Sequence, residues 1–120
     1  MLHQEITEQI LAAAFDVAHE LGAGFVENVY EKAMFVALKD KGLHASLQVP
    51  FKVKFRNVIV GDYVADMIVE DKVLVELKAV KTLTPEHQAQ VINYLEASGL
   101  EVGLLINFGN KKIEYKRLHR

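Results

Sequence analysis

The sequence predicts a single mixed α and β domain, and three observations lead to this fold class. First, the chain has 120 residues, which is enough for one hydrophobic core but not for a second domain. Second, apolar residues recur every three or four positions near the start of the chain, whereas further along they alternate. Third, no repeat, linker or low-complexity stretch divides residues 1–120. We expect two helices, three strands, one helix and two strands, with helices flanking a mixed sheet.

The first two elements are predicted helices. From Ile6 to Leu21 the apolar residues form one stripe at helical spacing, and Gly22 ends the pattern. A second helical pattern runs from about Glu27 to Lys41, where Gly42 supplies the C-terminal stop.

The middle of the chain is predicted to form three strands. Residues 51–56 alternate strictly between apolar and basic, which gives a strand with one basic face. Asp62 to Val69 and Val73 to Val80 follow, and the charged turn between them suggests a hairpin. A basic stripe on an edge strand serves solubility and prevents edge pairing, or else it meets the phosphates of a nucleic acid. The basic face consists of Lys52, Lys54 and Arg56.

The last three elements are a helix and two strands. Thr84 has the properties of an N-cap, Pro85 occupies the first helical position, and the helix continues to Ser98. Val102 to Asn107 is almost wholly apolar, which is typical of a central strand covered on both faces. Lys112 to Leu118 is more polar and is predicted to be an edge strand.

Composition excludes several functional classes. The chain has 14 Lys and Arg against 16 Asp and Glu, and the net charge of -2 argues against a histone-like nucleic-acid binder. The absence of Cys excludes disulfides, a thiol nucleophile and thiolate zinc sites, and it fits a reducing compartment. Because no signal peptide and no stretch long enough for a bilayer is visible, we expect a cytoplasmic protein without a membrane partner.

Three charged residues inside apolar strands are the main anomaly of the sequence. Asp66 lies in one strand of the predicted hairpin, and Glu76 and Lys78 share a face of the other strand. A buried charge is costly unless it is paired or bound to a metal. An odd number of residues in the hairpin loop would place Asp66 directly across from Glu76, whereas an even number would place it on the opposite face.

In the odd register, two carboxylates and one ammonium group would converge. Carboxylates so close together repel each other, and a hard divalent cation such as Mg²⁺ relieves the repulsion. A lysine beside that ion could orient or deprotonate a water molecule, or neutralise charge on a phosphate. The alternative is a solvated strand face that carries a Glu–Lys pair.

A resemblance to a known family gives these residues a role. Asp66, followed after nine residues by Glu76-Leu77-Lys78, resembles the signature of the PD-(D/E)XK nuclease superfamily, although Ala65 stands where the name of the superfamily has Pro. Residues 24–30 read G-x-x-E-x-x-Y and resemble the small bacterial and archaeal GxxExxY proteins, a branch of that superfamily. The similarity continues to the C-terminal half, in His87-Gln88-Ala89-Gln90, Tyr94-Leu95, Gly99-Leu100 and Gly103 to Phe108.

The resemblance implies a restriction-endonuclease-like core and a metal-dependent phosphodiesterase that uses Mg²⁺ or Mn²⁺. Asp66 and Glu76 would bind the metal together with the carbonyl oxygen of Leu77, and Lys78 would serve the attacking water. Glu27 would help to hold the metal, although a carboxylate in the first turn of a helix is favourable in any case.

The helix that follows Thr84 contributes further candidates. His87, Gln90 and Tyr94 have the spacing that places them on one helix face. The residues alone indicate an ordinary helix face with a satisfied histidine. The resemblance makes His87 and Gln90 candidates to contact the scissile phosphate or to brace the acidic cluster, and Tyr94 a candidate nucleic-acid contact.

Two functions therefore remain open. The first is a nuclease that acts on DNA or RNA and binds it weakly on its own. The second is a non-catalytic nuclease-fold module that acts as a homodimer or with a partner protein, which the low net charge and the lack of a recognition domain favour. A nucleotide-binding enzyme has little support, because Gly22-x-Gly24 follows a predicted helix instead of a strand.

Overall fold

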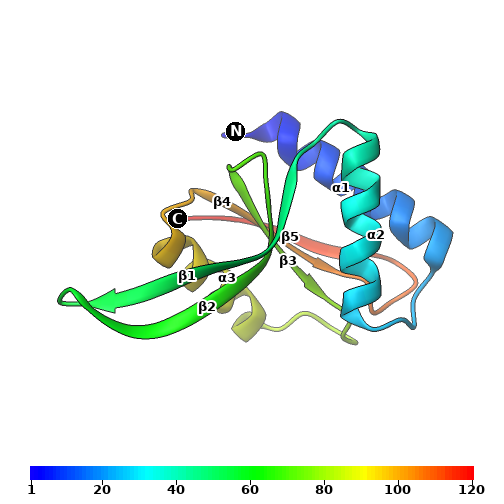
Figure 1. The fold of residues 1–120 in the computed structure, drawn as a ribbon. Coiled ribbons are helices and arrows are strands. Elements are labelled where there is room, and N and C mark those ends of the chain that lie inside the picture. Colours follow the sequence, from blue (N-terminus) through cyan, green and yellow to red (C-terminus); the bar gives the residue numbers. More distant parts are fainter.

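A five-stranded sheet forms the centre of the computed structural model, which describes residues 1–120 (Figure 1). Its strands are β1 (Ala45–Phe55), β2 (Val58–Val69), β3 (Val73–Lys78), β4 (Val102–Asn107) and β5 (Glu114–His119). They lie side by side in sequence order. The β3–β4 pair is parallel and every other pair is antiparallel, which confirms the mixed sheet.

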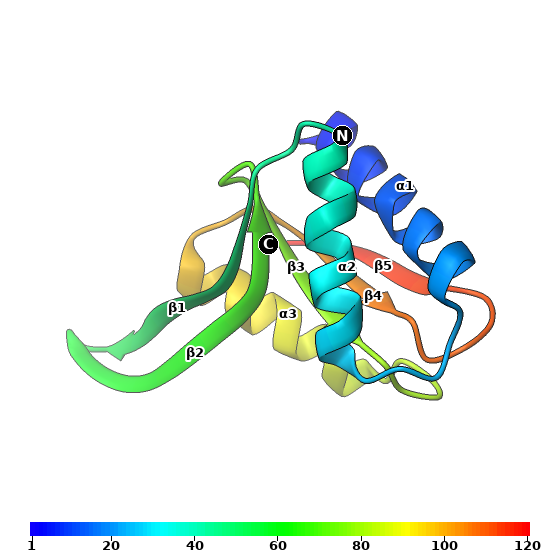
Figure 2. The same cartoon turned by 45° about the vertical axis from the view of Figure 1, so that its right-hand side comes forward.

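Helices cover both faces of this sheet (Figure 2). Two of them, α1 (Gln4–Leu21) and α2 (Glu27–Asp40), pack on one face, and α3 (Pro85–Ser98) packs on the other. The crossover that parallel strands require between β3 and β4 is formed by α3. The order of elements agrees with the prediction. None of the three helices is long and apolar enough to cross a membrane.

Two hydrophobic cores lie on either side of the sheet. The larger core of 18 buried residues lies beneath α1 and α2, and the smaller core of 6 buried residues lies beneath α3. All residues of β4 are buried, as expected for a strand covered on both faces. Each fully buried Leu or Ile side chain contributes about 1.5–3 kcal/mol to stability. The buried strands β3 and β4 are therefore the most stable part of the fold.

The predicted strand bounds differ most from the structure at the β1–β2 hairpin. β1 is longer than expected, and β2 begins at Val58 instead of Asp62. Arg56 and Asn57 form the two-residue turn between them, with left-handed φ values of 50° and 66°. Arg56 therefore lies in the turn and not on the basic strand face, which corrects the prediction. The other bounds differ by one or two residues.

The side chains of β2 switch from one face of the sheet to the other at Asp66, which lies opposite Gln48 of β1. Met67 belongs to the core beneath α1 and α2, whereas Ala65 packs in the core beneath α3. In a regular strand, residues two apart share a face, so the faces exchange between these two positions. The left-handed φ of 51° at Gln48 marks the same point on the neighbouring strand. Beyond it, β1 and β2 continue as a two-stranded arm that projects from the body (Figures 1 and 2).

Candidate metal and catalytic site

Asp66 and Glu76 face each other across the β2–β3 hairpin. The three-residue loop has the odd length, and the register pairs Met67 with Val75, so the next pair is Asp66 with Glu76. Each carboxylate bonds to the backbone of the facing strand. The N–H of Asp66 donates to Oε1 of Glu76 at 2.9 Å, and the N–H of Leu77 donates to Oδ2 of Asp66 at 2.8 Å. The two side chains therefore replace ladder hydrogen bonds at the point where the regular pairing ends.

Burial makes it unfavourable for Asp66 and Glu76 to be ionised at the same time. Glu76 is only 5% exposed. Loss of solvent, and then the negative charge of Asp66, raise the pKa of Glu76 to about 8, while Lys78 and the N–H of Asp66 counteract the rise. Two carboxylates that share a site in this way hold a proton or a cation more readily than isolated ones do.

Glu27 lies across a pocket from Asp66. It is the first residue of α2. The pocket has a volume of about 410 Å³ and also exposes Leu77. The lining residues are Glu27, Asn28, Glu31, Gln48, Asp66 and Leu77. The structure thus brings the predicted ligands Glu27, Asp66 and Leu77 to one pocket, and Glu76 is attached to it through its bond to Asp66.

The donors around this pocket have the chemistry that Mg²⁺ prefers. They are carboxylate and peptide oxygens, which are hard ligands. No three Asp, Glu, His or Cys side chains lie close enough together to form a metal cluster. The residues present nevertheless fit the ion by the type of their donor atoms. The carboxylates of Asp66 and Glu76 are the two acidic groups at the centre of the candidate site.

The spacing of Gly24, Glu27 and Tyr30 has a structural explanation. The Tyr30 hydroxyl donates to the carbonyl of Gly22 at 2.7 Å and accepts the N–H of Phe25 at 3.2 Å. Its ring is fully buried and stacks on Phe108, with centroids 4.6 Å apart. Gly24 has a φ of 111°, which side-chain-bearing residues rarely adopt. Tyr30 is thus a core residue, and it holds the loop that places Glu27 at the pocket.

The chain after Lys78 is held by a buried asparagine. Asn107, at the end of β4, accepts the N–H of Val80 at 2.9 Å and donates to the carbonyl of Val80 at 2.8 Å. The N–H of Phe108 donates to the carbonyl of Lys78 at 2.8 Å. A side chain at Gly109 would overlap the backbone of Val80. These contacts fix the end of β3, and with it the backbone that carries Glu76 and Lys78.

Comparison with known proteins agrees with this geometry. The model of the PD-(D/E)XK nuclease superfamily matches residues 4–118. The chain belongs to this superfamily.

Solved structures support the fold of this superfamily member. The crystal structure of SSO0001 is similar, with a TM-score of 0.58 and 17% sequence identity. The match covers 97% of this chain and 58% of that one, so the present chain spans little more than half of its length. At this identity the likeness concerns the fold, which is consistent with the restriction-endonuclease-like core. No curated protein matches the chain.

On α3 of this superfamily member, His87 has a clear structural contact. Its Nδ1 accepts the N–H of Thr84 at 3.0 Å, and Oγ1 of Thr84 accepts the N–H of His87 at 3.4 Å. These two bonds form a capping box, and they confirm the predicted helix start. Gln90, one turn further on, is half-buried.

Tyr94 lies in an aromatic cluster close to the acidic pair. Its ring centroid is 5.5 Å from that of Phe51 and 4.8 Å from that of Tyr63. Burial, followed by the negative charge of Glu76, raises the pKa of the Tyr94 hydroxyl. Tyr94 is 7% exposed, whereas Tyr63 is 38% exposed, so Tyr63 is the ring that a ligand would meet first.

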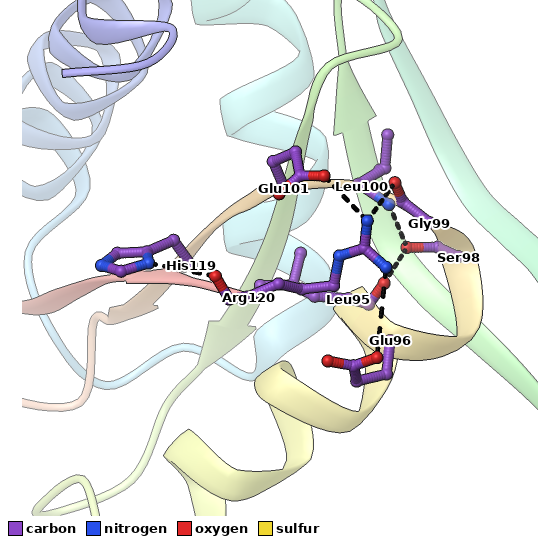
Figure 3. A network of polar contacts seen from close by, with 8 residues as sticks. All are labelled: Leu95, Glu96, Ser98, Gly99, Leu100, Glu101, His119 and Arg120. Atoms are coloured by element: carbon purple, nitrogen blue, oxygen red, sulfur yellow. Dashed lines mark hydrogen bonds and ion pairs between the residues drawn. The ribbon is translucent and has the colours of Figure 1, made fainter.

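Several basic residues of the protein already have partners. Lys52 forms an ion pair with Asp62 across the arm, and the guanidinium of Arg56 lies 4.9 Å from the ring centre of Phe55. At the basic C-terminus, Arg120 bonds to Glu101 at 2.8 Å and lies 4.0 Å from Glu96 (Figure 3). Lys54 has no ionic partner. Because Lys52 and Arg120 are paired with carboxylates, the free positive charge is smaller than the sequence alone indicates.

Four pocket or scaffold residues were absent from the predicted site: Asn28, Glu31, Gln48 and Asn107. Glu31 follows Glu27 at the four-residue spacing that places both on one helix face, and this signal could have identified it. Gln48 donates to Oε1 of Glu31 at 2.7 Å, but its orientation depends on a left-handed backbone that has no sequence signal. Asn107 was visible as a polar residue at the end of an apolar strand.

Proposed function

We propose that this protein is a Mg²⁺-dependent nuclease of the GxxExxY branch that hydrolyses phosphodiester bonds in DNA or RNA, with Mn²⁺ as an alternative ion. One observation carries the proposal: Asp66 and Glu76 lie opposite each other and bond reciprocally across the hairpin. Lys78 follows two residues later on the face of Glu76. Superfamily membership adds independent support.

The proposed roles follow from the chemistry of each side chain. Asp66, Glu76 and the Leu77 carbonyl would hold the metal, and Glu27 would complete the ligand set from α2. A bound divalent cation supplies Lewis-acid stabilisation and lowers the pKa of a coordinated water. The Lys78 ammonium group would orient the attacking water and offset the charge that develops on the phosphate.

Residues around the acidic pair would bind and orient the nucleic acid. We assign His87 and Gln90 to the scissile phosphate or to the support of the acidic pair. Lys54, together with Lys52, Arg56 and Tyr94, would contact the strand beyond the cleaved bond. Because a protein with few free cations binds nucleic acid weakly, cleavage assays should be run at low salt.

Substitution of Asp66 or Lys78 by Ala tests the proposal. Each variant should lower the rate of Mg²⁺-dependent cleavage of labelled single- and double-stranded DNA and RNA by about a hundredfold or more. The exposed Lys81, just after β3, offers a matched control, because Lys81→Ala removes the same charge outside the site. Circular dichroism verifies that the variants fold. A wild-type rate in either variant would remove that residue from the mechanism.

The second candidate is a nuclease-fold module without cleavage activity, acting as a homodimer or with a partner protein. The observation that favours it is the net charge of -2, with Lys52 and Arg120 already paired to carboxylates, because few free cations weaken binding to nucleic acid. Calorimetric titration of Mn²⁺ into the wild type and Asp66→Ala separates the two functions. A site of millimolar affinity or better that is lost in the variant supports the enzyme, whereas absence of binding in both supports the module.

A further inference from the structure

The β1–β2 arm carries the largest group of exposed apolar side chains in the protein. We define the arm as residues 49–65. Near its tip, Phe55 is 59% exposed, Val58 is 62% exposed and Val60 is 60% exposed. Such clusters of exposed apolar surface mark interaction sites in soluble proteins. The exposed large apolar residues of the arm are Phe55, Val58, Ile59, Val60, Tyr63 and Val64.

The arm and the rest of the molecule have opposite charge. The arm contains three cations and only one anion, Asp62. The remaining chain has 11 Lys and Arg against 15 Asp and Glu. An arm of this charge is attracted to an acidic surface, and the body of a second copy offers one.

A groove between α1 and α2 has the matching properties. Its volume is about 280 Å³, and its apolar lining includes Leu21 and Val36, both of which are exposed. Three carboxylates stand at the groove, from Asp16, Glu20 and Asp40. Lys41 pairs with Asp16 at 3.5 Å, which leaves Glu20 and Asp40 without an ionic partner.

We propose that the β1–β2 arm of one copy binds the α1–α2 groove of a second copy. Apolar side chains at the tip of the arm cover the apolar lining of the groove, and Lys54 and Arg56 lie near Glu20 and Asp40. Four of these exposed side chains, those of Val58, Ile59, Val60 and Val64, are aliphatic. They favour a protein partner, because bases stack on aromatic rings and not on Val or Ile. Lys54 and Arg56 would contact nucleic acid in a copy whose arm is free. Pro50 and the cations of β1 disfavour strand-to-strand pairing at the open edge, so the contact is made by side chains.

The placement of the two surfaces determines the kind of assembly. The arm and the α1–α2 pair lie on opposite sides of the body (Figures 1 and 2). A contact between different surfaces of identical chains is head-to-tail, so the two end copies of an open assembly still have one free arm and one free groove. The average mass should therefore rise with concentration past that of a dimer, and added salt should reduce it because the charges are exposed.

Charge reversal on each surface tests the contact by sedimentation velocity. The arm variant Lys54→Glu/Arg56→Glu and the groove variant Glu20→Lys/Asp40→Lys should each weaken self-association by about tenfold or more. In an equimolar mixture, every arm meets a groove of opposite charge, and association should return to the wild-type level. Lys111→Glu/Lys112→Glu changes the net charge as the arm variant does, but at exposed positions outside the arm, and should associate normally.

Two results would overturn the proposal. One is a wild-type protein that stays monomeric up to about millimolar concentration. The other is a mixture of the two variants that fails to associate although the wild type does. If the wild type is monomeric and the arm variant loses affinity for a labelled oligonucleotide, the arm serves nucleic acid and not a second copy. None of these measurements depends on cleavage, so the outcome is independent of the nuclease function.

Discussion

At the scale of single residues, Asp66 and Glu76 combine a structural and an electrostatic role. Each side chain accepts an N–H from the facing strand, so neither can be removed without leaving a backbone donor free. At the same time, burial and the charge of Asp66 make ionisation of Glu76 unfavourable. A bound cation would offset the free energy that ionisation of Glu76 beside Asp66 costs.

Replacement of Glu76 by Gln is expected to remove a pH dependence of stability. Because folding raises the pKa of Glu76 from 4.5 to about 8, the folded protein keeps a proton that the unfolded chain releases. This stabilisation is fully present below pH 4.5 and is lost as pH rises through 8. In that window the free energy of unfolding should fall by up to about 1.4 kcal/mol per pH unit.

Urea unfolding in EDTA, repeated at several pH values across this window, measures the effect. The wild type should lose stability relative to Glu76→Gln as pH rises. Glu5→Gln, at an exposed position of α1, controls for the change in charge and should follow the wild type. Parallel curves for the wild type and Glu76→Gln would show that Glu76 ionises as it does in solution.

The sequence limited the position of Asp66 to two alternatives, either directly across from Glu76 or on the opposite face of the sheet. Three residues between the strands select one of the two faces by counting alone. Gln48 could not be placed, because its left-handed φ arises from the exchange of faces in the folded sheet. For Glu27 the resemblance named a role that spacing could not supply, and the ligand roles of all these residues remain predictions.

At the scale of elements, α3 shows how local chemistry determines a boundary. Thr84 and His87 satisfy each other's backbone N–H groups, and Pro85 needs no donor partner at the first helical position. These residues lie next to one another in the chain, so the helix start was predictable. In the arm, by contrast, the turn at Arg56-Asn57 carries no glycine, and Asn57 is the one local signal for its left-handed backbone.

The capping box predicts different effects for two substitutions of His87. In His87→Gln a side-chain acceptor remains at the third helical position, so stability should stay within about 0.5 kcal/mol of the wild type. In His87→Ala the acceptor is lost, and the free energy of unfolding should fall by about 1 kcal/mol. Chemical denaturation measures both.

Cleavage assays on the same variants separate structure from function. If His87 contacts the phosphate, both variants should lose activity, whereas a purely structural His87 leaves His87→Gln active. Equal stability of His87→Ala and the wild type would show that the two hydrogen bonds to Thr84 contribute little in solution.

At the scale of the whole molecule, burial and local stability differ between the centre of the sheet and the arm. β3 and β4 lie between two cores and are almost wholly buried. The arm packs on α3 near its base, through Phe51 and Tyr63, but its tip is exposed and has only its own two strands. A two-stranded ribbon without a covering layer is marginally stable. The superfamily could be inferred from the sequence, but the length and exposure of the arm could not, because they depend on how β1 and β2 leave the sheet.

Hydrogen exchange should reveal this gradient of stability. Amides of β3 and β4 are expected to exchange at the rate of global unfolding, and amides of residues 53–61 should exchange at least about a hundredfold faster in dilute protein. Mass spectrometry or NMR at low concentration provides the measurement. Uniform protection of arm and centre would contradict the account of the arm as a separately opening unit.

The exchange of faces at Gln48 and Asp66 also has a consequence for how such a protein can evolve. The arm lies beyond this point, and the loop that aligns Asp66 with Glu76 lies on its other side. Insertions or deletions at the tip of the arm therefore leave the alignment of the carboxylates untouched. Insertion of a single residue between Asp66 and Glu76 would direct one of the two side chains towards the core on the opposite face of the sheet. The same β2 strand thus joins a segment free to diversify with one that tolerates no change in length.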